Sequence, residues 1–363
     1  MSKYVIINPD RRPSGLSVRC RNWESLCELN NADAEVVAAP ITLNFKKVIK
    51  NLKYVKDIFT GRMALEALFV NWEQIFKDLK SIQSRSEITK IIALTQRVFN
   101  PKLTLFDAPI ILDYVDLLSL SYKQRSKIEK SILKKIEFKI LSVQSKRFES
   151  SNKDITTFIA NPVEARKVGA RFFPNLINFN PNKYRHENDG YRWDIIFVGS
   201  LDYQPNIQAI REMTNSIIPG IRNSYPNLSV CIAGRRPTQE VKYLCKTMNA
   251  DLIQDFDQLV DVLGASKLAI SPVYMATGFQ NKVLEAAALN VPQLVSSNLL
   301  NTFEGINGFI SAEDNEQFID KALDILDDYS NYKLQAEKLH DQIVKTYSPE
   351  SYAHILNDET KHE

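Results

Sequence analysis

The sequence predicts an α/β protein built from two Rossmann-like domains in tandem. Short β-branched runs alternate with longer segments of helical periodicity throughout the 363 residues, which is typical of parallel sheets flanked by helices. A chain of this length corresponds to about two domains. The charge also divides the chain: residues 1–150 carry a net charge of +10 and the remainder −7, which indicates two domains with different partners.

In the first half, buried-type apolar runs predict strands, and amphipathic segments predict the helices between them. The expected strands are Tyr4–Asn8, Glu35–Ala39, Lys90–Leu94, Ile110–Tyr114 and Thr156–Ala160. The expected helices are Leu16–Leu29, Phe45–Phe59, Ala64–Ser81 and Tyr122–Ser150. The last helix is strongly basic. We expect most of its apolar stripe to belong to the core; the stripe contains Ile128, Ile132, Leu133, Ile136, Ile140 and Leu141.

The second half repeats this scheme after a polar, turn-rich segment at Asn178–Arg192, where we place the linker. The expected strands are Trp193–Val198, Ser229–Ala233, Leu252–Ile253, Leu268–Ile270 and Gln293–Ser296. The expected helices are Ile207–Asn223, Val241–Met248, Leu259–Ala265, Lys282–Ala288 and a region from Asn315 onward. We therefore expect domains at residues 1–182 and 190–345, with residues 346–363 returning to the first domain.

The composition excludes several classes of protein. With 44% hydrophobic and 25% charged residues the chain is of globular type, and no apolar run reaches the roughly 18 residues of a membrane span. The amino terminus lacks the features of a signal peptide, and the four cysteines have no metal-type spacing, so we expect a cytoplasmic protein with reduced thiols and no metal site. The basic first half lacks the aromatic strand pattern of RNA-binding domains, so no nucleic-acid partner is expected.

The first motif that carries chemistry lies where a predicted strand ends at Gly199-Ser200 and a helix begins after Pro205-Asn206. Backbone amides and a helix amino terminus at the carboxyl end of a parallel strand suit a phosphate group. A tight turn without a ligand is the alternative.

A second motif, Gly234-Arg235-Arg236-Pro237, follows the next strand. The planar guanidinium group suits a diphosphate, and a solvated arginine pair is the alternative.

The third motif, Thr277-Gly278-Phe-Gln280-Asn281-Lys282-Val-Leu-Glu285, opens a helix. Lys282 adds positive charge near the start of that helix, and Glu285 lies one turn further on, where a carboxylate can accept hydrogen bonds from ribose hydroxyls. A surface Lys–Glu pair is the alternative. The three motifs in this order within one domain are a much stronger indication of a ligand-binding site than any one of them alone.

With these motifs, residues 193–310 resemble the donor-binding domain of glycosyltransferase family 4, and in particular the exopolysaccharide and capsule sugar transferases. The resemblance implies the GT-B fold, in which two Rossmann-like domains face a central cleft and a carboxyl-terminal helix crosses back to the first. It also implies a retaining, metal-independent transfer of sugar from a nucleotide-diphosphate sugar, without a further cofactor. In that family the arginine and lysine bind the donor diphosphate, and the glutamate binds the ribose.

The resemblance extends more weakly into the first half, through Gly15-Leu-Ser-Val-Arg19 and Asp113-Tyr-Val-Asp116-x-x-Ser119. The donor-binding residues expected on this basis are Gly15, Arg19, Gly199, Ser200, Asn206, Gly234, Arg235, Arg236, Thr277, Gly278, Gln280, Asn281, Lys282 and Glu285.

Two positions depart from the family pattern. Many relatives have a glutamate where this chain has Thr277, and many have a histidine in the first domain, where this chain has none. Asp116, or Asp113 if its strand ends earlier, is therefore the expected group that orients or deprotonates the acceptor, with Arg235 and Lys282 stabilising the leaving group. The alternative is that both carboxylates are structural and cap the helix that begins near Ser121.

The expected function is transfer of a sugar to a growing bacterial surface glycan, which is free or lipid-linked. The basic helix face Lys46–Lys56 suits either an anionic membrane surface or plain solvation. Two alternatives stay open: a non-catalytic nucleotide-sugar-binding scaffold, and an epimerase or phosphorylase on the same fold.

Overall fold

A computed structural model describes residues 2–9, 15–42, 45–129, 131–180, 190–254, 256, 259–275 and 278–357. The chain forms two compact units. The first contains residues up to Asn178, together with Gly278–Phe279 and the segment from Pro349 onward; the second contains Phe179 to Met275 and Gln280–Ser348 among the described residues.

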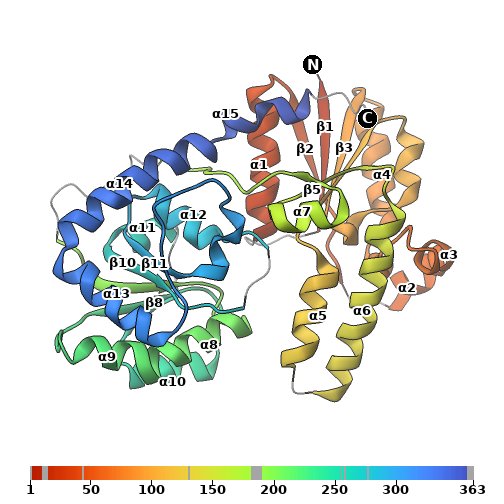
Figure 1. The fold of residues 1–363 in the computed structure, drawn as a ribbon. Helices are drawn as coiled ribbons and strands as arrows, with labels where there is room; N and C mark the ends of the chain where they lie inside the picture. The colour runs from red at the N-terminus through yellow and green to blue at the C-terminus, as the bar shows by residue number, and fades with distance from the viewer. Residues whose placement is uncertain are drawn as a thin grey trace. The chain divides into compact units, whose positions relative to one another are not determined.

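The first unit is a six-stranded parallel sheet with the strand order β2-β1-β3-β4-β5-β6 (Figure 1). The strands are β1 (Lys3–Asn8), β2 (Asp33–Ala38), β3 (Ile88–Leu94), β4 (Ile110–Val115), β5 (Thr156–Ile159) and β6 (Arg171–Phe172). The α-helices are α1 (Gly15–Leu29), α2 (Phe45–Asn51), α3 (Val55–Phe59), α4 (Trp72–Gln83), α5 (Leu118–Ile128), α6 (Ile132–Ser151), α7 (Pro162–Val168) and α15 (Pro349–Tyr352). Four short 3₁₀ turns lie between β2 and β4, and a fifth (Ala353–Leu356) follows α15.

The second unit is also a six-stranded parallel sheet, with the order β12-β11-β10-β7-β8-β9. Its strands are β7 (Trp193–Val198), β8 (Val230–Ala233), β9 (Asp251–Ile253), β10 (Ser266–Ser271), β11 (Gln293–Ser296) and β12 (Ile310–Ala312). Its helices are α8 (Gln204–Glu212), which continues through a π-helical turn (Met213–Ile217) into α9 (Ile218–Arg222), then α10 (Gln239–Thr247), α11 (Leu259–Gly264), α12 (Asn281–Ala288), α13 (Asn315–Asp327) and α14 (Tyr329–Thr346).

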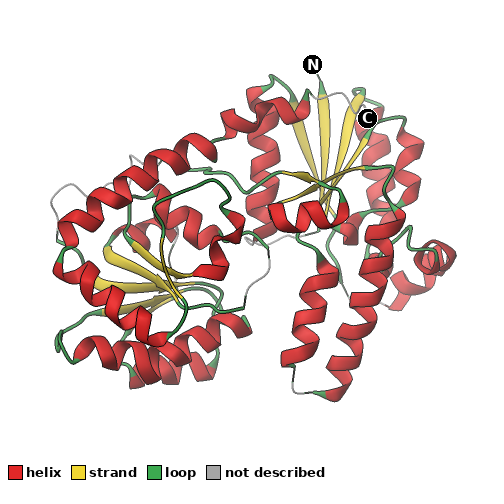
Figure 2. Cartoon of the chain, viewed as in Figure 1, coloured by secondary structure: helices red, strands yellow, loops and turns green. Residues whose placement is uncertain are grey.

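Each sheet is covered by helices on both faces, as Figure 2 shows. In β1, Val5 and Ile7 pack in a core with α4, whereas Tyr4 and Ile6 pack in a second core with α1 and the end of the chain. A strand that is buried on both faces is apolar at successive positions, which is why β1 has a continuous hydrophobic run rather than an alternating one. The prediction of a two-unit α/β fold is confirmed.

The end of the chain packs on the first unit. The Tyr352 ring lies 5.8 Å from the Phe173 ring, measured between centroids, and Asn30 Nδ2 donates a hydrogen bond of 2.9 Å to the carbonyl oxygen of Ala353. Ile355 and Leu356 belong to the same hydrophobic core as α1.

The predicted helix Tyr122–Ser150 is wrong in two respects. The segment forms a hairpin of two helices, α5 and α6, rather than one helix. The α6 face turned toward the core is built from Phe138, Ser145 and Phe148, so the apolar stripe that we expected to be buried lies on the opposite, exposed face. Periodicity shows that a helix has an apolar stripe but does not show whether another element covers it.

The predicted helices Phe45–Phe59 and Ala64–Ser81 are also interrupted. A 3₁₀ turn at Leu52–Tyr54 separates α2 from α3, and another at Leu65–Phe69 precedes α4. The buried Asn51 holds these pieces together because its side-chain amide donates to the carbonyl oxygens of both Leu68 and Val70.

All four cysteines of the chain are buried and free. Burial raises the pKa of each thiol, to about 12 for Cys20, Cys27 and Cys231 and to about 11 for Cys245. Within the described residues, none of the helices has the length and hydropathy needed to cross a bilayer.

Candidate functional site

The carboxyl ends of β7, β8 and β10 form a candidate site within the second unit. The chain enters the second sheet at β7, moves outward through β8 and β9, and then returns to the other side of β7 with β10. This reversal is the topological switch point at which open α/β sheets bind ligands. The three motifs predicted from the sequence follow these same three strands.

Two glycines allow the loops at this edge to lie against one another. A Cβ atom on Gly234 would lie 1.8 Å from the carbonyl oxygen of Gly199, and one on Gly199 would lie 2.5 Å from Nδ2 of Asn206. Neither position can therefore hold a side chain without displacing the backbone or Asn206. The loops present backbone at the end of the sheet, which is the arrangement that suits a closely bound phosphate.

Asn206 and Lys282 connect the two sides of the switch point. Asn206, in the first turn of α8, donates a hydrogen bond of 3.0 Å from Nδ2 to the carbonyl oxygen of Ser200. Its Oδ1 accepts a hydrogen bond of 3.3 Å from the ammonium group of Lys282, at the start of α12. That ammonium group also lies 4.8 Å from the centroid of the Phe197 ring. Burial lowers the pKa of Lys282 to about 7.

The two arginines after β8 differ in their surroundings. Arg236 has a positive φ of 57°, its Nε lies 3.0 Å from Oδ2 of Asp202, and its Nη2 donates a 2.9 Å hydrogen bond to Oγ of Ser200. Arg235 contributes its carbonyl oxygen to the turn by accepting a 2.9 Å hydrogen bond from the backbone of Leu201, and its side chain is exposed. Arg236 thus braces the loop, and both arginine side chains are exposed at this edge.

The predicted ribose contact lies on α12. Glu285 is partly buried, one turn after Lys282, and Gln280 and Asn281 are partly buried at the start of the helix. Gly278 and Phe279 are part of the first unit. Thr277 lies outside the described residues.

In the first unit, Asp113 and Arg19 form a fully buried ion pair. Arg19 Nε lies 2.5 Å from Oδ2 of Asp113, and Nη2 donates to Oδ1 at 3.1 Å. The remaining guanidinium nitrogen donates to the carbonyl oxygen of Pro174 at 2.7 Å, and the group lies 4.0 Å from the centroid of the Phe173 ring. Trp23 Nε1 adds a third donor to Asp113, at 2.7 Å. Arg19 and Asp113 thus have their polar atoms engaged inside the core, and the donor-binding role of Arg19 and the catalytic role of Asp113 stay predictions. Gly15 begins α1.

Asp113 shapes the end of β4. Its Oδ1 accepts a 3.0 Å hydrogen bond from the backbone nitrogen of Val115, at a bulge in which the pairing with β5 shifts between Asp113 and Val115. Val115 has a φ of 63°, which is rare for a β-branched residue. Bulges and strained residues of this kind occur next to active sites, where they redirect a side chain. The residue that this bulge presents is Asp116.

Asp116 lies beside a second carboxylate, Glu164, and against the Gly278 segment. Gly278 has a φ of 73°, and a Cβ atom there would lie 2.2 Å from Oδ1 of Asp116. The backbone nitrogen of Gly278 donates to Oε1 of Glu164 at 3.3 Å, and that of Phe279 donates to Asp116. Burial, and next the nearby Glu164, raise the pKa of Asp116 to about 7 despite the opposing effect of Arg19.

The alternative in which Asp113 and Asp116 cap the following helix is wrong. The amide of Leu117 donates to Glu164 at 2.9 Å, and that of Ser119 donates to Glu149 at 3.1 Å. These two glutamates therefore accept hydrogen bonds from the backbone amides at the start of α5. Neither glutamate was expected from the sequence: Asn161-Pro162-x-Glu164 indicates a helix start, but nothing in this pattern shows that the glutamate turns toward another helix.

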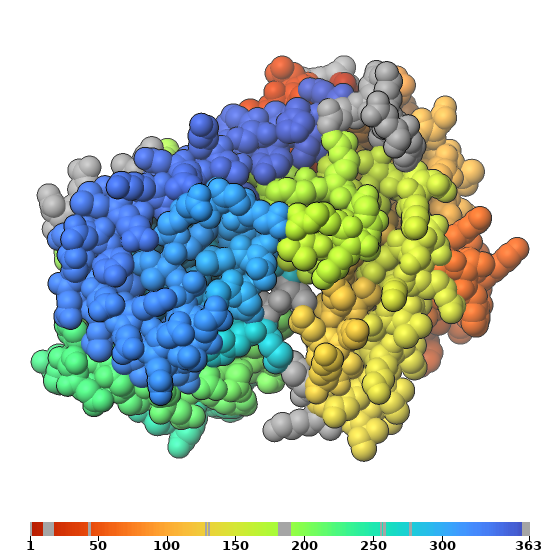
Figure 3. All heavy atoms as spheres, viewed as in Figure 1, coloured from red at the N-terminus to blue at the C-terminus, as the bar shows by residue number. Residues whose placement is uncertain are grey.

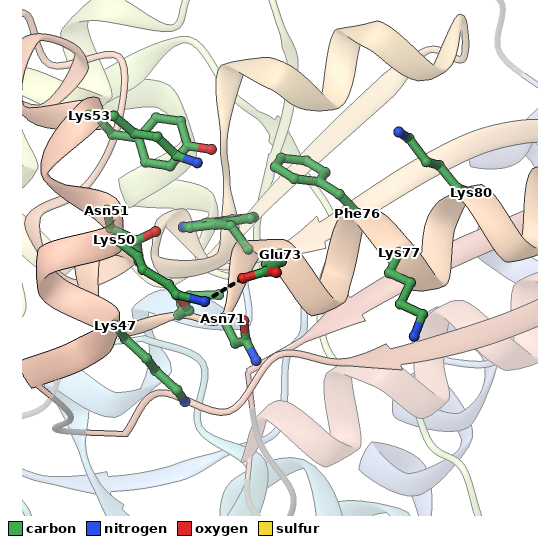
Figure 4. Close-up of a pocket in the computed structure, with 12 residues that line it drawn as sticks. Lys47, Lys50, Asn51, Lys53, Asn71, Glu73, Phe76, Lys77 and Lys80 are labelled. Atoms are coloured by element: carbon green, nitrogen blue, oxygen red, sulfur yellow. Dashed lines mark hydrogen bonds and ion pairs between the residues drawn. The ribbon is translucent and has the colours of Figure 1, made fainter.

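A separate cavity of about 660 Å³ lies between α2 and α4 (Figure 4). Lysines surround it, with the aromatic rings of Tyr54, Trp72 and Phe76 at its wall; the lysines are Lys47, Lys50, Lys53, Lys77 and Lys80. Glu73 is the acidic residue in the lining and pairs with Lys50 at 2.7 Å. The predicted basic face of residues 46–56 is thus part of a larger basic surface.

Two parallel six-stranded sheets in tandem, with a glycine-lined switch point and a partly buried lysine in the second, have the GT-B fold of the solved structures that this chain resembles. Residues 192–328 match the family model described as "Glycosyl transferases group 1". This match supports the prediction of a nucleotide-sugar-dependent glycosyltransferase through residues 192–328. Among the described residues no group of histidine, cysteine and acidic side chains could hold a metal ion.

Solved structures of glycosyltransferases resemble this chain over almost its whole length. HepE from Anabaena, in complex with UDP and glucose, is 11% identical with a TM-score of 0.60, and 99% of each chain is covered. Sucrose-phosphate synthase from Thermosynechococcus elongatus is 11% identical with a TM-score of 0.66, and 98% of each chain is covered. TarM from S. aureus, in a complex that contains UDP, is 11% identical with a TM-score of 0.66, and the match covers 98% of this chain and 99% of TarM. A search of curated protein sequences finds no match.

Removing the Lys282 ammonium group should weaken binding of a nucleoside diphosphate. Loss of a charge-assisted hydrogen bond costs about 1.5–3 kcal/mol, so Lys282→Ala should lower the affinity for UDP roughly 10- to 100-fold in calorimetry. The protonated lysine is the form that binds phosphate, and its pKa in the free protein is about 7. Above pH 7 binding must therefore take up a proton, and the wild-type affinity should fall as the pH rises to 9.

The pH series supplies the control for this prediction, because the diphosphate is fully ionised above pH 7. Lys282→Ala should remove the pH dependence, whereas Lys246→Ala, an exposed lysine at the end of α10, should leave it unchanged. Equal affinities and equal pH profiles in wild type and Lys282→Ala would rule out the phosphate contact.

Proposed function

We propose that this protein transfers a sugar from a nucleoside-diphosphate donor, held by the second unit, to a hydroxyl group of a glycan acceptor. The observation that supports this most directly is the switch point of the second sheet, where two closely packed glycine turns adjoin Asn206 and the partly buried Lys282. Uridine diphosphate is the first nucleotide to test, since the HepE and TarM structures contain it.

Two roles in the proposed transfer are assigned to residues of this chain. Lys282 and Arg235 neutralise the charge that develops on the leaving diphosphate, as cationic groups do in phosphoryl chemistry, so the proposed transfer needs no metal ion. Asp116 accepts a hydrogen bond from the acceptor hydroxyl, orients it and removes its proton. We further propose, from the family resemblance, that the configuration at the sugar carbon is retained.

We propose that the acceptor is a bacterial surface glycan of the capsule, exopolysaccharide or lipopolysaccharide type, and that the protein works in the cytoplasm at the inner face of the membrane. The excess of positive charge in residues 1–150 and the lysine-lined cavity of Figure 4 support a first unit that meets an anionic surface or acceptor.

A test of donor use separates an enzyme from a nucleotide-sugar-binding scaffold. Incubation with UDP-sugars, without an acceptor, should release UDP slowly through transfer to water, and Asp116→Asn should lower that rate. Binding of UDP without any release from a panel of UDP-, GDP-, ADP- and TDP-sugars, with or without glycan acceptors, would favour the scaffold.

The ribose contact gives a further prediction. Glu285→Gln keeps one carbonyl acceptor but replaces the other with a donor, so it should weaken binding of UDP. Calorimetry with 2′,3′-dideoxy-UDP completes the test: the wild type should bind it less tightly than UDP, and Glu285→Gln should bind the two alike. If the wild type binds both equally, Glu285 has no ribose role.

A further inference from the structure

The outward face of α6 carries exposed aliphatic side chains. Ile132, Leu133, Ile136, Ile140 and Val143 are between 51% and 80% exposed, although each is large and branched. Single exposed hydrophobic residues are ordinary on protein surfaces, but a contiguous set marks an interaction site. These five lie within four successive turns of one helix.

The helical repeat places this set opposite the packed face of α6. Residues 132, 136, 140 and 143 fall on one side at spacings of three and four. The other side packs on α5: the Phe138 ring stacks on Tyr122 with 6.1 Å between the ring centroids, and Ser142 Oγ donates a 2.7 Å hydrogen bond to the carbonyl oxygen of Ser119. The exposed set is therefore not the edge of the core but a second apolar face.

Beyond Val143, α6 contacts the end of α3. Arg147, one turn after Val143 on the same side, donates from Nη1 to the carbonyl oxygen of Phe59 at 3.0 Å, at the end of α3. The Phe59 side chain is 72% exposed. We call the exposed face made by the five aliphatic residues of α6 the apolar ridge.

Lysines flank the apolar ridge. The 3.6-residue helical repeat places three lysines along one edge of the aliphatic stripe. They are Lys135, Lys139 and Lys146. Across residues 123–147, nine basic residues accompany two acidic ones. Figure 3 shows α6 (yellow) on the surface of the first unit.

We infer that the apolar ridge inserts into the interfacial layer of an anionic bilayer, with the flanking lysines on the lipid phosphates. This inference rests on the membrane association proposed above and names the element that makes it. A helix with an aliphatic face beside a lysine-rich edge is the pattern of interfacial helices. Protein–protein interfaces, in contrast, are enriched in tryptophan, tyrosine and arginine and depleted in lysine. The composition of this aliphatic, lysine-flanked surface differs from that pattern.

Vesicle flotation tests this inference, because charge attraction and apolar insertion respond differently to salt. The probes are phosphatidylcholine vesicles with and without phosphatidylglycerol, at low salt and at 0.5 M NaCl. Wild type should float with the anionic vesicles, and part of it should stay bound at high salt, where surface charges are screened. Ile136→Ser with Ile140→Ser should lose the salt-resistant fraction. Lys135→Gln with Lys139→Gln should lower binding to anionic vesicles at least tenfold at low salt.

Two controls make each outcome decisive. Leu334→Ser removes a side chain that is 55% exposed on α14, in the second unit, and should float like wild type. All variants should bind UDP with wild-type affinity. A result against membrane insertion of the ridge can therefore be distinguished from a result against the proposed donor site. The inference is overturned if the ridge variants float like wild type, if wild type does not float, or if the ridge variants change only the mass measured by light scattering, which would assign the ridge to contact with a second copy.

Discussion

Asp116→Asn should lower the rate of sugar transfer by about 10²–10⁴-fold, the range expected when a general base is removed. The carboxylate is presented by a bulge at a strained Val115, and its pKa of about 7 matches a base that works near neutral pH. Transfer by the wild type should rise with pH through 7 as Asp116 ionises. Initial-rate measurements across pH 5.5–8.5, at saturating donor, would show this limb in the wild type and its loss in the variant.

Stability measurements separate this role from a structural one. Because the pKa of Asp116 is higher in the folded protein than the ordinary aspartate value of 3.8, folding binds a proton between these values, and the stability that Asp116 contributes is lost as the pH rises toward 7. Asp116→Asn should therefore melt at the same or a higher temperature than the wild type at pH 8. Asp154 is an exposed carboxylate of the same unit, and Asp154→Asn should change neither the melting temperature nor the rate of transfer. A variant that melts lower but turns over normally would make Asp116 structural.

Arg19→Met should be the most destabilising of the substitutions considered. It leaves the carboxylate of Asp113 buried without its charge partner, and breaking a buried pair in this way costs about 3–5 kcal/mol. Urea denaturation should show the loss in the transition of the first unit. The double variant Arg19→Met with Asp113→Leu should be less destabilised than the sum of its parts, since neither charge is then left alone.

UDP binding by the Arg19→Met variant tests whether Arg19 has the donor-binding role predicted from the sequence. If Arg19 is structural, UDP should bind the folded variant as it binds the wild type, because the donor motifs lie in the other unit. A variant of normal stability with weakened UDP binding would return Arg19 to the donor site.

The place of the three expected donor motifs in the second sheet was predictable because each motif is local. Gly199, Gly234 and Lys282 each follow a strand within its own strand–turn–helix segment, and parallel strands bring such segments to one edge. The close approach of Gly234 to Gly199 depends on the neighbouring position of β7 and β8, but the glycines themselves mark the turns.

The acceptor side was less predictable because its decisive contacts are long-range. Arg19 and Asp113 are 94 positions apart, and both resemble ligand-binding residues when read alone. The sequence pattern could not show that they satisfy each other, nor that Glu164 rather than an aspartate caps α5. The exposure of the outward face of α6 was not predicted for a related reason, because an apolar stripe has the same sequence pattern whether or not another element covers it.

The four buried thiols of the chain have a practical consequence. Thiol-reactive probes attack the thiolate, and burial both shields these sulfurs and keeps them protonated at neutral pH. An introduced surface cysteine would then be labelled selectively without first removing the native ones. A dye pair placed at Asp154 in the first unit and Lys246 in the second would report the separation of the two units in solution, and how it changes when a nucleotide sugar is added.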